Sequence, residues 1–102
     1  MREIVLVDAA DQTFATTFAG KPCEMRWRFN PTSDRWSFDL SIEGVEVLRG
    51  RRLVLGIDLL AAFDFGIGAL FAVDYARAGA VPDYRNVIDR KVRIFQHDEA
   101  GA

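Results

Sequence analysis

Two segments in the first half of the chain alternate large apolar side chains with polar ones. The apolar positions are Cys23, Met25, Trp27, Phe29, Trp36, Phe38, Leu40 and Ile42. The polar positions between them are Glu24, Arg26, Arg28, Ser37, Asp39 and Ser41. Because successive side chains of a strand point to opposite faces, this period of two predicts strands over residues 21–29 and 35–42. Residues 30–34 are rich in turn formers, so the two strands are expected to form a hairpin.

The apolar face of this hairpin supplies most of the candidate core. We expect the core to be formed by Phe14, Trp27, Phe29, Trp36, Phe38, Leu40 and Ile42. Shorter β-branched or apolar runs predict further strands at residues 4–7, 12–18, 45–48, 53–57, 69–75 and 87–95. The apolar run at 59–63 fits helix, strand or loop, and we favour strand or loop. Residues 76–86 contain Gly79, Pro82 and Asp83, which predicts a surface loop.

The succession of strands predicts an all-β fold. We expect a small single-domain antiparallel β-barrel or a strongly bent sandwich of about seven or eight strands, with the barrel preferred. With 102 residues and no linker-like stretch, the chain is expected to be one domain over residues 1–102. The polar residues 96–102 are expected to form a flexible tail.

Composition narrows the class of protein. A net charge of −2 and a pI near 5.3 give the chain no overall attraction to nucleic acid. Cys23 is the only cysteine, which excludes an internal disulfide and favours a reducing compartment, and its place on the apolar face predicts a buried thiol. The first residues lack the apolar core of a secretion signal, so we expect a cytoplasmic start. Asp58 and Asp64 interrupt the apolar region 53–73, which argues against a membrane span.

Few residues offer chemistry. His97 is the only histidine and is expected to lie in the solvated tail. Asp58 and Asp74 could serve as acid and base of a small hydrolase, but we favour roles in which they, like Asp64, bond to backbone groups in turns. The pair of glycines in residues 66–68 is too short for a dinucleotide-binding motif. We therefore expect no catalytic residue, no metal site, no cofactor and no enzymatic activity.

Arginine makes up all but two of the 13 basic residues. Arg49, Arg51 and Arg52 form a cluster, and Arg26, Arg28 and Arg35 are expected at outward or turn positions. Because guanidinium groups form forked pairs with carboxylates, these arginines predict an interface with another protein. The alternative is a β-barrel module that binds single-stranded nucleic acid or oligosaccharide. That function would require rings such as Trp27, Trp36, Phe38 or Phe29 to be exposed beside Arg26, Arg28 or Arg35.

Several short motifs follow one another along the chain in a characteristic order. They are Gln12-Thr13-Phe14, Trp27, Trp36-x-Phe38-Asp39-Leu40, Gly44, Gly50, Leu53-x-x-Gly56-Ile57-Asp58-Leu59-Leu60, Gly68-x-Leu70 before Asp74, and Val92-x-Ile94. In these motifs the chain resembles the small baseplate plug family of phages with contractile tails. The resemblance spans nearly the whole chain and ends at Phe95.

The resemblance implies a non-enzymatic structural component of the virion. Such a protein is expected at the centre of the baseplate, near the junction of tail tube, hub and spike, and in several copies around the tail axis. It is expected to act by packing against other baseplate proteins, after assembly in the cytoplasm of the bacterial host. Membrane and nucleic-acid partners are not expected. The family has no catalytic residues to carry over to this sequence.

Overall fold

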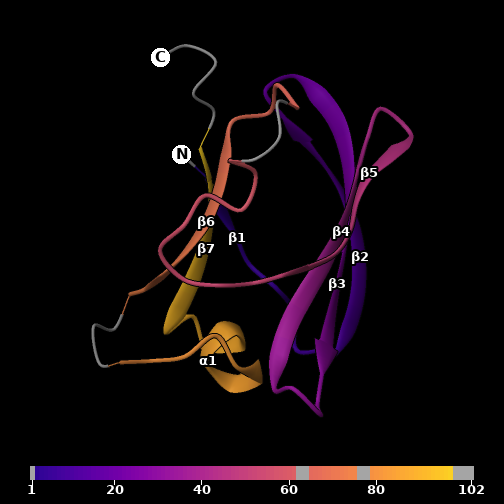
Figure 1. Cartoon of the computed structure of the whole chain (residues 1–102). Coiled ribbons are helices and arrows are strands. Elements are labelled where there is room, and N and C mark those ends of the chain that lie inside the picture. Colours follow the sequence, from indigo (N-terminus) through magenta and orange to yellow (C-terminus); the bar gives the residue numbers. More distant parts are fainter. Residues whose placement is uncertain (1, 62–64, 76–78, 98–102) are drawn as a thin grey trace.

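A computed structural model of the chain describes residues 2–61, 65–75 and 79–97 (Figure 1). Within these ranges the chain forms seven strands and one short helix. In chain order these are β1 (Arg2–Ile4), β2 (Asp11–Phe18), β3 (Lys21–Asn30), β4 (Arg35–Ile42), β5 (Val45–Arg52), β6 (Ala69–Asp74), α1 (Tyr84–Ile88) and β7 (Val92–His97).

The strands form two antiparallel sheets that face each other (Figure 1). The large sheet has the order β2-β3-β4-β5, and the small sheet has the order β1-β7-β6. The expected all-β antiparallel fold is therefore confirmed in its sandwich form, and the preference for a barrel is wrong. A closed barrel needs hydrogen bonds between its first and last strands. Here β2 and β5 remain the edges of their sheet, and residues 53–60 cross from the large sheet to the small one.

The core fills the space between the two sheets. Trp27, Trp36, Phe38, Leu40 and Ile42 are buried there, whereas Phe14 and Phe29 are partly buried against the cluster. The small sheet contributes Ile4, Leu70, Ala72, Val92 and Ile94, and the crossing segment contributes Leu53, Leu59 and Leu60. Burial of this apolar surface is the main force that stabilises the sandwich.

Two tight turns set the register of the large sheet. Ala19 and Gly20 link β2 to β3, and Glu43 and Gly44 link β4 to β5; φ is 51°, 80°, 52° and 82° respectively. Positive φ at both central residues is the geometry of the two-residue turn whose twist matches that of paired strands. The predicted strands over 12–18, 21–29 and 35–42 are confirmed, and the hairpin between them pairs in full register.

The segment expected as a strand over 53–57 is not one. It pairs with β6 through a single parallel bridge, between Leu55 and Ala72, and the Gly56 amide donates to the Ala72 carbonyl at 3.0 Å. Residues 59–61 form a turn, while 62 and 63 of the ambiguous run lie outside the described residues. The first strand also differs from expectation, because β1 ends at Ile4 instead of covering 4–7.

The loop expected at 76–86 ends inside α1, which spans Tyr84–Ile88, and the strand expected from residue 87 begins only at Val92. The Asp83 side chain caps the helix by accepting a hydrogen bond from the Asn86 amide at 2.8 Å. Residues 76–78 lie outside the described ranges. Five helical residues are too few for a helical period to show in the sequence.

The prediction of a flexible tail from residue 96 onward is wrong for residues 96 and 97. β7 continues through His97, and the buried Gln96 side chain donates to the Ile67 carbonyl at 2.7 Å. His97 is partly buried in the strand rather than free in solvent. Residues 98–102 lie outside the described residues.

An ion pair fixes the start of the chain on the small sheet. Glu3 of β1 accepts hydrogen bonds of 2.6 and 2.8 Å from the Arg90 guanidinium, just before β7. The hydrogen bond from Arg90 is the main cause that lowers the pKa of Glu3 below its ordinary value of 4.5, with the charges of Arg90 and Arg93 adding to it against the opposing effect of burial. Since the folded state favours the ionised carboxylate, this pair stabilises the fold at neutral pH.

The Glu3 pair is expected to contribute stability above the carboxyl pKa of the unfolded chain and to lose it as the pH falls through the lowered pKa of the folded state. We expect a double-mutant cycle with Glu3→Gln and Arg90→Gln to give a favourable coupling energy at pH 7. The coupling should be largely lost at an acidic pH at which the Glu3 carboxyl of the folded state is protonated. Urea unfolding of the four proteins at both pH values measures it, and equal coupling at the two values would contradict the assignment.

Candidate interaction surface

The side of the large sheet that points away from the small sheet is polar and charged. We call it the outer face. Its two central strands, β3 and β4, present Glu24, Arg26, Arg28, Ser37, Asp39 and Ser41. These are the polar positions of the period-two pattern, so their orientation follows from the burial of the alternate residues.

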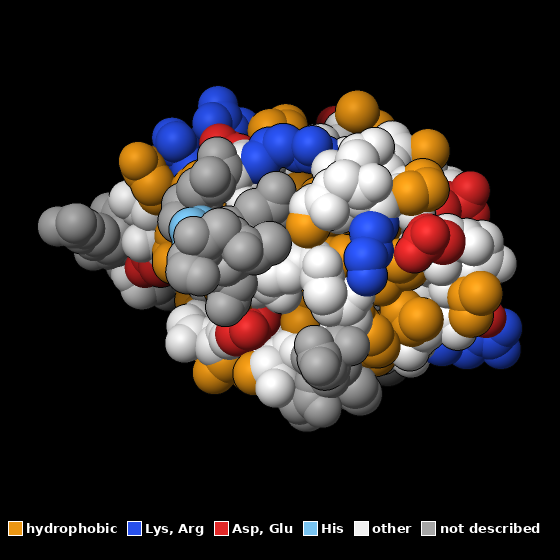
Figure 2. Space-filling model, turned by 90° about the horizontal axis from the view of Figure 1, so that it is seen from above, with side chains coloured by type: hydrophobic (Ala, Val, Ile, Leu, Met, Phe, Trp, Pro, Cys, Tyr) orange, Lys and Arg blue, Asp and Glu red, His pale blue; other side chains and the backbone are white. Residues whose placement is uncertain are grey.

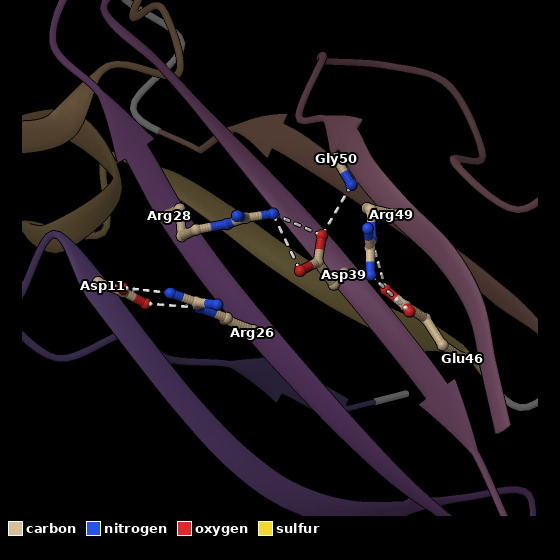
Figure 3. Close-up of polar contacts among 7 residues, drawn as sticks. All are labelled: Asp11, Arg26, Arg28, Asp39, Glu46, Arg49 and Gly50. Carbon is tan, nitrogen blue, oxygen red and sulfur yellow. Dashed lines mark hydrogen bonds and ion pairs between the residues drawn. The ribbon is translucent and has the colours of Figure 1, made fainter. Parts of the chain in front are cut away.

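Three of the six candidate interface arginines are paired within the chain (Figure 3). Arg26 of β3 reaches Asp11 of β2 through hydrogen bonds of 2.7 and 3.0 Å. Arg28 reaches the less exposed carboxylate of Asp39 on β4 at 2.7 and 2.9 Å. Arg49 of β5 reaches Glu46 at 3.0 and 3.1 Å. The hydrogen bond from Arg26 lowers the pKa of Asp11, as expected of a carboxylate held by a guanidinium.

Asp39 also organises the edge strand β5. Its Oδ1 accepts a hydrogen bond of 2.7 Å from the Gly50 amide, in addition to the bonds from Arg28 (Figure 3). Gly50 has a positive φ of 66° and lies where the pairing of β4 with β5 shifts register. Gly50 is therefore part of a β-bulge that the Asp39 carboxylate holds.

The other three candidate arginines form no ion pair within the described residues. Arg35 and Arg52 line one polar hollow of about 180 Å³ on the outer face, together with Asn30, Ser33, Ser37 and Gly50. Arg51 is opposite Phe38 and thus on the inward side of β5, with its Nε buried. The structure thus brings Arg35 and Arg52 together and separates Arg51 from them.

A second hollow lies at the opposite end of the outer face. It has a volume of about 280 Å³ and is lined by Ala15, Pro22, Cys23, Glu24, Ser41 and Gly44. Glu24 is exposed and, among the described residues, no cation lies within ion-pair distance of it. The exposed Glu43 follows in the tight turn beside this hollow. The outer face is therefore basic at the hairpin end and acidic at the end with the two tight turns.

The side of the small sheet that points away from the large sheet carries aromatic residues. We call it the aromatic face. Phe71 of β6 and Phe95 of β7 lie opposite each other with ring centroids 6.0 Å apart, and the Tyr75 ring is 6.3 Å from that of Phe95. The Arg93 guanidinium carbon lies 3.8 Å from the Tyr75 ring centroid. Phe71, Tyr75 and Phe95 are not among the residues that the sequence predicts to form an interface. The apolar run 69–73, which lacks polar alternation, is the signal that a sheet is covered on both faces.

Other exposed apolar side chains lie, except for Val45 of β5, in segments between the strands. They are Val5, Val7, Val45, Ile57 and Val81. Figure 2 views the molecule from above relative to Figure 1. On the surface that it shows, hydrophobic, basic and acidic side chains are interspersed. In the described ranges, no helix has the length and hydropathy of a membrane span.

The rings required for a nucleic-acid or oligosaccharide site are not on the surface. Trp27, Trp36 and Phe38 are fully buried. Phe29 is partly buried and packs edge-on against Trp36 and Tyr84, at centroid distances of 5.6 and 5.2 Å. These rings therefore offer no exposed stacking platform beside the arginines of β3 and β4.

The carboxylates of the hydrolase alternative are bonded to the backbone. Asp58 Oδ1 accepts from the Leu60 and Leu70 amides at 3.0 Å each. Asp74 Oδ2 accepts from the amides of Gly79 and Ala80 at 2.8 and 3.0 Å. Both aspartates thus hold turns, as preferred from the sequence, while Asp64 lies outside the described residues.

Thiol and metal chemistry find no support either. Cys23 is buried, and burial raises the pKa of its thiol. Within the described residues, no three His, Cys, Asp or Glu side chains are grouped as metal ligands would be. The surfaces that a partner could contact are therefore the charged outer face of the large sheet and the aromatic face of the small sheet.

One comparison with known proteins finds a matching family. A family model described as the cyanophage baseplate Pam3 plug gp18 matches residues 1–99. A search of curated proteins finds no match.

Proposed function

Because the chain belongs to the family of the cyanophage baseplate plug, a structural family and not a family of enzymes, we propose that it plugs the junction of tail tube, hub and spike in a contractile tail. In the baseplate it acts by packing against these neighbours, in several copies around the tail axis. The observation that carries the proposal is the match over residues 1–99, nearly the whole chain.

The two surfaces suit a protein that works by packing. The aromatic face formed by Phe71, Tyr75 and Phe95 offers apolar area to a neighbour, which is what the centre of a stable interface needs. The outer face of the large sheet offers charged groups, which add specificity and orientation more than affinity. A sandwich whose two faces differ this strongly can contact two different neighbours at once.

The proposal is tested by light scattering of the purified chain, alone and mixed with the tail-hub, spike and tube proteins encoded beside it. We expect a complex of defined mass with at least one of them. Tyr75→Asp, which puts a charge on the exposed aromatic face, should weaken that complex at least tenfold, a change of about 1.4 kcal/mol. The matched control is Val81→Asp, which adds the same charge at an exposed residue outside this face.

A chain that ignores these proteins would contradict the proposal. Binding of single-stranded nucleic acid by such a chain, with a strong dependence on salt, would favour the alternative of a nucleic-acid-binding module. Binding of the hub proteins with equal affinity by wild type and Tyr75→Asp would remove the aromatic face from the proposal.

A further inference from the structure

The outer face of the large sheet carries opposite charges at its two ends. Ser37 of β4 is paired with Arg28 on one side and with Arg52 on the other, which makes a basic row. Four residues further along β4, Ser41 is paired with Glu24 and Glu46, which makes an acidic row. Four residues of strand span about 13 Å, so the two rows are separate sites on one surface.

The basic site is suited to a carboxylate. Arg35 and Arg52 line the same hollow, and within the described part of the chain neither guanidinium has a carboxylate partner. The neighbouring Arg28 is already paired with Asp39. The exposed Asp34 in the turn offsets part of the positive charge, but the Arg35 Nη1 hydrogen-bonds its backbone carbonyl instead, at 2.9 Å. Two guanidinium forks in one polar hollow are arranged to hold a carboxylate through several charge-assisted bonds.

The acidic site is suited to a guanidinium. Its hollow of about 280 Å³ is bordered by two small residues, Ala15 and Gly44, and is also lined by the exposed residue Glu24. The exposed Glu43, with a positive φ of 52°, directly precedes Gly44, which lines the hollow. Glu46 already holds Arg49. Glu24 and Glu43 are therefore the carboxylates available to an incoming arginine.

We propose that copies of this chain dock head to tail, with Glu24 and Glu43 of one copy bound by Arg35 and Arg52 of the next. The charges decide the occupant, because one chain supplies both halves of a complementary pair. A two-fold contact that placed the acidic sites of two copies against each other, or their basic sites, would bring like charges together. When each copy uses its acidic site for one neighbour and its basic site for another, the contact is heterologous, and it forms a ring when its rotation closes. The inference deepens the several-copy arrangement of the proposed function, but it needs no hub, spike or tube protein.

The test uses two charge-reversal variants of the full chain. The first is Arg35→Glu with Arg52→Glu, and the second is Glu24→Arg with Glu43→Arg. Sedimentation velocity at low salt is expected to show assemblies of the wild type that dissociate in about 0.5 M salt, where the Debye length falls to a few ångströms. Each variant alone should associate at least tenfold more weakly. A matched control for the first variant, Arg85→Glu with Lys91→Glu, lowers the net charge by the same amount at exposed residues outside the outer face and should assemble like the wild type.

Mixing the two variants gives the decisive result. Each mutant site repels its wild-type counterpart, and two complementary contacts remain between the variants: the intact acidic end of the first with the intact basic end of the second, and the two reversed ends with each other. We therefore expect equimolar mixing to restore the assembly. A wild type that stays monomeric at low salt and high concentration, or a mixture that stays monomeric, would overturn the inference. Complex formation with the hub proteins is measured separately, so either idea can fail without the other.

Discussion

Replacement of Trp36 by alanine is expected to lower the free energy of unfolding by about 3–5 kcal/mol, the usual cost of removing a buried aromatic side chain. The Trp36 side chain is fully buried, and its ring stacks on that of Tyr84 at a centroid distance of 5.4 Å. Its indole Nε1 donates to the Asp83 carbonyl at 3.2 Å. One side chain thus joins β4 of the large sheet to the start of α1, and its loss both opens a cavity and releases the helix.

Urea unfolding followed by circular dichroism measures this loss, which is a large part of the 5–15 kcal/mol typical of a domain. Trp36→Phe keeps a ring and gives up the indole hydrogen bond, so its cost should lie between wild type and alanine. Val45→Ala, at a residue that is 62% exposed, should change little. Equal stability of Trp36→Ala and Val45→Ala would contradict the role of Trp36 in the core.

Replacement of Asp39 by alanine is expected to lower the free energy of unfolding by about 2–3 kcal/mol, because it removes hydrogen bonds to charged groups at a poorly exposed position. The Asp39 side chain is 18% exposed, and it accepts from Arg28 and from the Gly50 amide. Without the carboxylate, the β-bulge at Gly50 loses its acceptor and the half-buried Arg28 loses its counter-charge.

Asp39→Asn separates the two contributions, since an amide oxygen can still accept from Gly50 while the charge is lost. Its cost should therefore be smaller than that of the alanine variant and should shrink in high salt, where the contribution of the ion pair is screened. Arg49→Ala removes the exposed pair with Glu46 and should leave stability nearly unchanged. An Asp39→Ala variant as stable as Arg49→Ala would refute the idea that Asp39 organises this edge.

The large sheet could be predicted from the sequence because its signals are local. β3 and β4 alternate strictly, since one face is buried and the other is in water, and Glu43-Gly44 has the form of a tight turn. The choice between sandwich and barrel could not be predicted, because it depends on the pairing of β7 with β1 and β6 across long stretches of chain. Leu53–Ile57 has strand-like composition, yet its backbone pairs with β6 at a single bridge.

The interaction surface was only partly predictable, for a related reason. Period two places Arg26 and Arg28 outward, but it does not say which carboxylate each will meet. The pairing of Arg28 with Asp39 depends on the register of β3 with β4, and the bulge at Gly50 turns Arg51 inward while Arg52 stays outward. The helix α1 had one local signal, the capping residue Asp83, three residues before Asn86, but too few residues follow for a helical period to appear.

The baseplate role is tested most directly by locating the protein in intact particles of a phage that encodes it. Gold labelling with an antibody to this chain, viewed by electron microscopy, is expected to mark the baseplate end of the tail and to leave the capsid and the length of the tail unlabelled. Mass spectrometry of purified baseplates should detect the chain at a fixed ratio to the hub protein. Label spread along the whole tail, or particles that lack the chain altogether, would contradict its role as a structural component of the baseplate.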